Sequence, residues 1–174
     1  MPGLVMADLE TQAAATALLE LCKARKLMVA TAESCTGGLV IGALTDIAGS
    51  SAVVDRGFVT YTDEAKEQML GVPAERLKAH GAVSRETAEA MARGVLARAP
   101  VDLAVSITGI AGPGGGSPDK PVGLVHFAAA SRRGRLIHRE RRYGDIGRAE
   151  VRRRSVLEAL SMLSELASGE RPKS

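Results

Sequence analysis

Hydrophobic and polar positions along the chain follow two spacings, one typical of helices and one typical of strands. Apolar residues at helical spacing predict helices over 7–25, 36–47, 84–98 and 147–167, and a shorter helix between Thr62 and Gly71. Short apolar runs predict strands over 27–32, 53–61, 101–107, 122–130 and 135–143. A tight turn over 131–134 joins the last two strands, which indicates a β-hairpin.

The order of these elements predicts the fold class. Helices alternate with strands early in the chain and a hairpin comes late, which indicates an α/β protein. We expect a three-layer α/β/α sandwich with a mixed, mostly parallel sheet of about five or six strands. The chain has 174 residues, enough for one substantial core, so we expect a single domain over 1–174.

Polar residues stand at the ends of three predicted strands. Ser34, Tyr61 and Thr108 each fall at or just after such an end. Ligands of α/β sheets usually bind beyond the carboxyl ends of the strands. We therefore expect these three residues to meet at one site.

Composition narrows the classes of function. Aromatic residues make up only 2% of the chain and Trp is absent, which largely excludes stacking platforms for single-stranded nucleic acid. The net charge of +3 suits an anionic substrate but does not by itself indicate a nucleic-acid partner. Cys22 and Cys35 form no CxxC pair, which predicts reduced thiols in a cytoplasmic protein. We see no signal peptide and no apolar run long enough for a membrane.

The segment 31–38, Thr-Ala-Glu-Ser-Cys-Thr-Gly-Gly, joins a predicted strand to a predicted helix. Backbone N–H groups on such a turn are unpaired and the local dipole is positive, so Ser34 could act as a nucleophile there. Serine is also a common helix N-cap, and the spacing alone favours that interpretation. Cys35 is either a rival nucleophile, with a pKa lowered by the turn, or a small buried hydrophobic residue.

Lys66 is a candidate base. It lies early in the short helix after Tyr61, where the helix dipole disfavours a cation. Burial would lower its pKa further and leave a neutral amine, whereas Asp63, Glu64 and Glu67 would oppose that change if they lie close. Residue type alone favours a lysine on the surface.

The loop over 108–117 is rich in glycine but lacks the ending of a P-loop and leads into a strand. It is either a long connection or a set of free N–H groups for a phosphate or polar ligand. Arg148 follows at the start of the last helix, and an arginine there can hold phosphate with two hydrogen bonds. The histidines at 80, 126 and 138 fall in unrelated segments and form no legible metal cluster or Ser-His-Asp arrangement.

Four motifs follow one another along the chain. They are Ala-Glu-Ser-Cys-Thr-Gly-Gly at 32–38, Gly-Phe-Val-Thr-Tyr at 57–61 with Lys66, His-Gly-Ala-Val-Ser at 80–84, and Thr-Gly-Ile-Ala-Gly-Pro at 108–113. With these motifs the chain resembles the C-terminal domain of the competence/damage-inducible protein A (CinA) family, over nearly its whole length. The resemblance implies an amidase that converts nicotinamide mononucleotide to nicotinate mononucleotide and ammonia in pyridine nucleotide recycling. It implies a serine-lysine dyad, with no metal and no cofactor.

The resemblance also implies roles for individual residues. Ser34 would be the nucleophile, Lys66 the base, and Tyr61 a residue that orients the pair. Arg148 would hold the phosphate, although Ile146 and Gly147 separate it from the Gly-Asp pair that it usually follows, so Arg152 is an alternative clamp. Residues implied to bind substrate, or to lie in or beside the pocket, are Glu33, Thr36, Gly37, Ser51, Thr108, Gly109, Gly112 and Arg148.

Partners and alternatives follow from the same reasoning. We expect a small-molecule nucleotide as substrate, no nucleic acid, no membrane, and a homo-oligomer, since small amidases of this kind often associate. A non-catalytic nucleotide-binding or regulatory module of the same fold would bind without releasing ammonia. Nucleic-acid binding through the arginine-rich end would instead show a steep dependence of affinity on salt.

Overall fold

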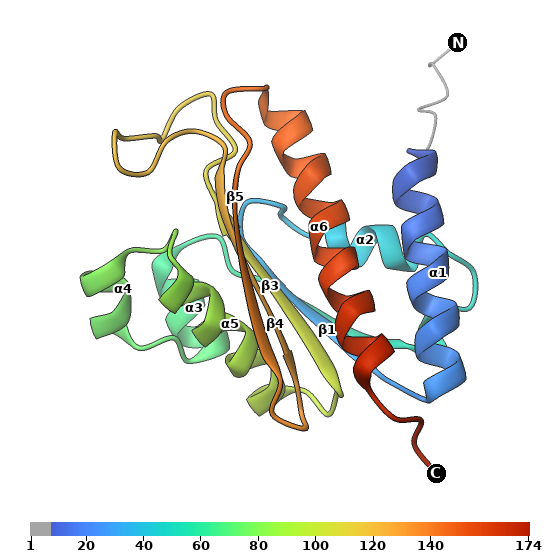
Figure 1. The fold of residues 1–174 in the computed structure, drawn as a ribbon. Helices are drawn as coiled ribbons and strands as arrows, with labels where there is room; N and C mark the ends of the chain where they lie inside the picture. Colours follow the sequence, from blue (N-terminus) through green and yellow to red (C-terminus); the bar gives the residue numbers. More distant parts are fainter. Residues whose placement is uncertain (1–7) are drawn as a thin grey trace.

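A computed structural model describes residues 8–174 and shows one five-stranded sheet with the order β2-β1-β3-β4-β5 (Figure 1). Strands β2, β1 and β3 run parallel, whereas β4 and β5 form an antiparallel hairpin beside them. The sheet is therefore mixed, as predicted, and β3 lies at its centre. The strands are β1 (Val29–Glu33), β2 (Val54–Val59), β3 (Leu103–Gly109), β4 (Leu124–Ser131) and β5 (Leu136–Arg142).

Helices cover both faces of the sheet (Figure 1). One face carries α1 (Leu9–Arg25), α2 (Leu39–Thr45) and α6 (Arg148–Gly169), and the other carries α3 (Asp63–Leu70), α4 (Ala74–His80) and α5 (Arg85–Arg98). The three-layer α/β/α sandwich predicted from the sequence is confirmed. Within residues 8–174, none of the helices combines the length and the apolar character needed to span a membrane.

The layer of α5 lies very close to the sheet. The strand residues that face this helix are small: Ala30, Ala32, Ala104, Ser106, Ala128 and Ala130. The Ser106 hydroxyl reaches the Ala88 carbonyl in the middle of α5. On its outer side α5 meets α3, and a Cβ added at Gly94 would stand 2.2 Å from the carbonyl oxygen of Leu70. Glycine at position 94 thus allows α3 to pack against α5.

Capping hydrogen bonds are found at two of the predicted helix starts. The Thr62 hydroxyl accepts a hydrogen bond from the Ala65 N–H at 3.0 Å and begins α3, which ends at Gly71. Ser84 caps α5 in the same way, accepting from the Thr87 N–H at 3.2 Å. The predicted start of the first helix, residue 7, lies outside the described residues.

Other boundaries differ from the prediction. Helix α2 begins at Leu39 and not at 36, because Gly37 and Gly38 have φ values of +56° and +105°, which a right-handed helix does not contain. Helix α4 and the 3-10 turn η1 (Ser50–Ala52) were not predicted. Both are short, and α4 carries few apolar residues, so neither gives a clear periodic signal.

Candidate active site

Ser34 and Lys66 lie in contact although 32 positions separate them in the sequence. Ser34 directly follows β1, and Lys66 lies one turn into α3. Parallel pairing puts the ends of β1 and β2 side by side, and the Thr60 N–H donates to the Glu33 carbonyl at 2.9 Å. The chain then turns back through α3, so that Lys66 Nζ lies 3.1 Å from Ser34 Oγ.

The amine of Lys66 is buried, with only 1% of the residue exposed. Burial lowers the pKa of this amine, and the charge of Asp63 opposes the shift to a smaller extent. Two carbonyl oxygens face Nζ, Thr60 O at 2.8 Å and Tyr61 O at 3.5 Å. In the neutral amine these carbonyls can accept both N–H groups, which leaves the lone pair for the Ser34 hydroxyl. This is the arrangement of a nucleophile beside a general base.

Cys35 does not have the properties of a nucleophile. Burial raises the pKa of its thiol to about 12, so the thiol is protonated near neutral pH. The lowered pKa considered from the sequence required a helix N-terminus at this residue, but α2 begins only at Leu39. Cys35 instead belongs to the apolar cluster beneath α6.

Glu33 has a different position from the one implied by the resemblance. Its carboxylate is fully buried and does not line the cavity beside Ser34. It accepts five hydrogen bonds, from Thr31 Oγ1 (3.3 Å), Thr36 Oγ1 (2.7 Å) and the N–H groups of Gly38 (3.2 Å), Val40 (2.9 Å) and Ile41 (3.0 Å). The free N–H groups at the start of α2 therefore bind Glu33 and are not available to a ligand. Thr36 is buried with it.

A cavity of about 260 Å³ opens in front of the Ser34 hydroxyl. It brings together most of the residues predicted from the sequence, which come from four separate segments. Its walls are formed by Ser34, Cys35, Tyr61, Lys66, Ala82, Val83, Thr108, Gly109, Ile110, Ala111, Gly112, Gly114, Gly115 and Arg148. Ala82 and Val83 had no predicted role, although the motif at 80–84 contains them.

Arg148 and Tyr61 both line this cavity, and their side chains touch each other. The Arg148 guanidinium donates to the Tyr61 hydroxyl at 3.1 Å and to the Gly112 carbonyl at 2.9 Å. Tyr61 therefore reaches Arg148 with its side chain and Lys66 only with its backbone carbonyl. Arg152 does not line the cavity, and its guanidinium donates to the carbonyls of Cys35 (3.1 Å) and Thr36 (3.4 Å).

The end of β3 and the loop after it contribute residues 108–112, 114 and 115 to the cavity wall. The Thr108 hydroxyl donates to the Ala82 carbonyl at 2.8 Å and so ties this loop to the segment before α5. Gly109 lies against β4, where an added Cβ would come within 2.9 Å of the Leu124 carbonyl oxygen. Glycine is required there by the close approach of two backbones.

Two expected residues lie elsewhere. Ser51 is in η1, before β2, and the pairing of Val54 with Val29 places the start of β2 at the start of β1. The expectation that Ser51 lies beside the pocket is not met, because this is the end of the sheet opposite Ser34. Gly37 is exposed on the turn, next to Arg152.

The histidines lie apart from Ser34 and Lys66. His126 and His138 lie on the neighbouring strands β4 and β5, and their ring nitrogens are 2.9 Å apart. Neither lines the cavity at Ser34. In the described part of the chain, no group of three or more His, Cys, Asp and Glu residues is arranged to hold a metal ion.

Comparison with known proteins identifies the family. The profile of the CinA C-terminal domain matches residues 11–167. The chain belongs to the CinA C-terminal domain family. Among curated CinA relatives, it is 52% identical over 159 residues to nicotinamide-nucleotide amidohydrolase PncC of Escherichia coli (strain K12), which covers 91% of this chain and 95% of that protein.

Other CinA relatives differ in length. A CinA-like protein of Mycolicibacterium gilvum is 52% identical over 141 residues, which are 81% of this chain but only 33% of that longer protein. Among solved structures, the competence/damage inducible protein CihA from Agrobacterium tumefaciens is 58% identical and superposes with a TM-score of 0.89. That match covers 90% of this chain and 95% of the CihA chain.

Proposed function

We propose that this protein is an amidohydrolase that converts nicotinamide mononucleotide to nicotinate mononucleotide and ammonia. The observation that carries the proposal is the 3.1 Å contact between Ser34 Oγ and Lys66 Nζ at the wall of a cavity. The 52% identity to a protein named nicotinamide-nucleotide amidohydrolase supports the choice of substrate. In this role the protein would serve pyridine nucleotide recycling in the cytoplasm.

The first half of the reaction transfers the nicotinamide acyl group to Ser34. Neutral Lys66 takes the hydroxyl proton while Ser34 Oγ bonds to the amide carbon, which gives a tetrahedral oxyanion. The N–H groups of Cys35 and Thr36 have no acceptor among residues 8–174 and are candidates to stabilise this oxyanion. One such donor typically lowers the barrier by about 3 kcal/mol.

The second half releases the acid. Protonated Lys66 gives its proton to the amide nitrogen as the C–N bond breaks, and ammonia leaves. Water then attacks the acyl carbon of the acyl-enzyme and passes one proton to Lys66. The ester bond to Ser34 breaks and releases the acid. Ser34 Oγ takes the proton back from Lys66. Both halves need Lys66 to alternate between neutral and charged forms, which is consistent with a lowered pKa.

Recognition of the nucleotide is assigned to Arg148 and the glycine-rich loop, which line the same cavity as Ser34 and Lys66. Arg148 points two of its N–H groups at Tyr61 and Gly112, and its remaining N–H groups can bind a phosphate. The glycine-rich loop offers further backbone N–H groups in this cavity. Arg148→Ala should therefore raise KM and leave kcat nearly unchanged.

The deciding experiment measures ammonia release from nicotinamide mononucleotide by the purified protein. Ser34→Ala and Lys66→Met should each abolish most of the turnover while the circular dichroism spectrum stays that of the wild type. Binding of the nucleotide without ammonia release would replace the enzyme proposal with the non-catalytic module. Full turnover by Ser34→Ala would remove Ser34 as the nucleophile.

A further inference from the structure

The turn that carries Ser34 is held from outside the cavity by an arginine of α6. Arg152 Nε donates to the Cys35 carbonyl at 3.1 Å, and Arg152 Nη2 approaches the Thr36 carbonyl at 3.4 Å. Within residues 8–174 Arg152 forms no ion pair, whereas the next residue, Arg153, pairs with Asp8, Glu10 and Glu150. The charge of Arg152 is therefore directed at the backbone of this turn.

These contacts determine where the next N–H group points. The Cys35–Thr36 peptide bond is trans, so its carbonyl and the Thr36 N–H point in opposite directions. The carbonyl faces Arg152, which does not line the cavity, while Ser34 and Cys35 do. The Thr36 N–H, which has no acceptor in the described part of the chain, therefore points away from Arg152.

The other end of the turn is fixed by Glu33. Its buried carboxylate binds the Thr36 hydroxyl and the N–H groups of Gly38, Val40 and Ile41. Glu33 thus binds N–H donors of the turn, and Arg152 binds its carbonyls. A donor for a developing oxyanion must be oriented before the reaction, since reorientation during the reaction adds to the barrier.

We propose that Arg152 is a positioning residue that orients the Thr36 N–H toward the oxyanion formed at Ser34. The inference rests on the proposed amidohydrolase function and deepens it. It also gives Arg152 a role different from phosphate binding, because its guanidinium already binds two carbonyls outside the cavity. Arg148, which lines the cavity, keeps the contact with the phosphate.

The first test separates kcat from KM. Arg152→Ala should lower kcat by about 10- to 100-fold, somewhat less than the loss of a donor itself, and should leave KM nearly unchanged. Arg152→Lys should recover part of kcat, because an ammonium can still donate to one carbonyl but lacks the fork of the guanidinium. Arg148→Ala should show the opposite pattern.

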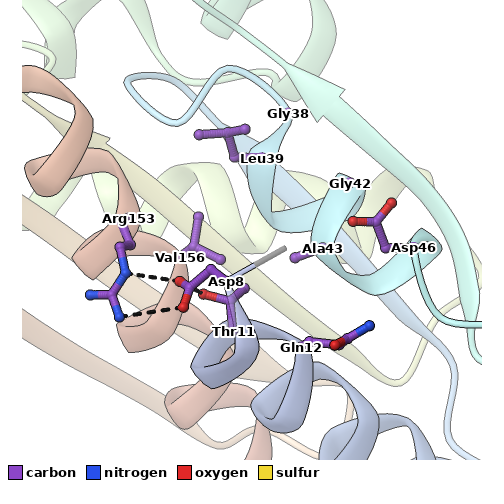
Figure 2. A pocket seen from close by; sticks show the side chains of 10 residues that line it. All are labelled: Asp8, Thr11, Gln12, Gly38, Leu39, Gly42, Ala43, Asp46, Arg153 and Val156. Atoms are coloured by element: carbon purple, nitrogen blue, oxygen red, sulfur yellow. Dashed lines mark hydrogen bonds and ion pairs between the residues drawn. The ribbon is translucent and has the colours of Figure 1, made fainter. Parts of the chain in front are cut away.

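Arg153→Ala is the matched control. Figure 2 shows Arg153 turned toward Asp8 in a separate pocket of about 360 Å³ between α1, α2 and α6. This substitution removes the same side chain one residue away, and kcat should stay at the wild-type value. Thermal unfolding of both variants checks that each remains folded.

A second readout does not need the nucleotide. An alkyl fluorophosphonate reacts with an activated serine: the Ser34 oxygen bonds to phosphorus, fluoride leaves, and Lys66 takes the hydroxyl proton. The developing P–O⁻ uses the same N–H donors, so Arg152→Ala should react more slowly than wild type and Arg153→Ala equally fast. Ser34→Ala gives the background rate.

The outcomes distinguish the two proposals. Wild-type protein that reacts with the fluorophosphonate but releases no ammonia would overturn the amidohydrolase function alone. An Arg152→Ala variant with unchanged kcat and labelling rate, or with a raised KM and unchanged kcat, would overturn the positioning role alone. A wild-type Ser34 that is inert in both assays would overturn both.

Discussion

Replacing Gly94 with alanine tests whether the packing of α3 on α5 sets the distance between Ser34 and Lys66. The added Cβ would stand 2.2 Å from the Leu70 carbonyl oxygen, about 1 Å inside van der Waals contact. The Leu70 carbonyl carbon and Cβ, at 3.0 and 3.1 Å, leave no room on either side. Because Leu70 ends the helix that carries Lys66, α3 must move away from α5.

The magnitude has two opposing parts. Overpacking of this kind costs about 1–3 kcal/mol of folding free energy. Alanine in place of glycine inside a helix returns about 0.5–1 kcal/mol. We therefore expect Gly94→Ala to lower the free energy of unfolding by about 1–2 kcal/mol. A displacement of Lys66 by about 1 Å should lower kcat by about 100-fold.

Urea unfolding and ammonia release measure the two effects, and Gly42→Ala is the control. Gly42 lies inside α2, and a Cβ there would have no atom within 4 Å. This control should gain about 0.5–1 kcal/mol and keep its kcat. If Gly94→Ala were as stable and active as wild type, the dyad distance would not depend on this contact and the reasoning would be refuted.

Three further predictions concern single side chains at the site. The pKa of Lys66 is lowered in the folded protein from its usual 10.5. At pH values between these two pKa values, Lys66 carries a proton in the unfolded chain but not in the folded chain. The free energy of unfolding of the wild type therefore rises with pH in this window. Lys66→Met should be more stable than wild type at neutral pH. Urea unfolding across a pH series should show this difference in stability shrinking as the pH approaches 10.5. A difference that stays constant with pH would contradict the lowered pKa of Lys66. Thr60 Oγ1 is buried without a hydrogen-bond partner in the described residues, so Thr60→Val should add about 1 kcal/mol to the free energy of unfolding and keep kcat, because the carbonyl that faces Lys66 remains. Cys35→Ala should retain most of its kcat since the thiol is protonated; loss of all turnover in a folded variant would give Cys35 a chemical role.

The sequence predicted those parts of the fold whose causes are local. The helix starts near Thr62 and Ser84 were predicted correctly because each hydroxyl binds an N–H group only three residues away. The sandwich followed from the order of the elements. The start of α2 was misplaced because two glycines can adopt many conformations, and the one observed is held by contacts such as that of the Gly38 N–H with the Glu33 carboxylate.

The candidate site could be predicted only in part. The distance between Ser34 and Lys66 depends on the parallel pairing of β1 with β2, which spacing along the chain does not reveal. Motif resemblance supplied the pair of residues but not their surroundings. The resemblance implied that Glu33 binds substrate or lies beside the pocket, because a motif marks a residue as necessary without saying what it contacts. In the structure the Glu33 carboxylate binds the N–H groups at the start of α2 and does not line the cavity. The parallel pairing of β1 with β2 also places Ser51 at the end of the sheet opposite Ser34.

The hydrogen bond from the Thr60 N–H to the Glu33 carbonyl closes a short ring of bonds through Ser34 and Lys66. The contact between Ser34 and Lys66 is therefore coupled to the outermost strand, β2, which has a neighbour on only one side. Fraying of that edge would separate the two groups before the rest of the sheet opened. Hydrogen–deuterium exchange at the Thr60 amide would report this local opening directly. Its rate should follow the fraction of molecules in which Ser34 and Lys66 are no longer in contact.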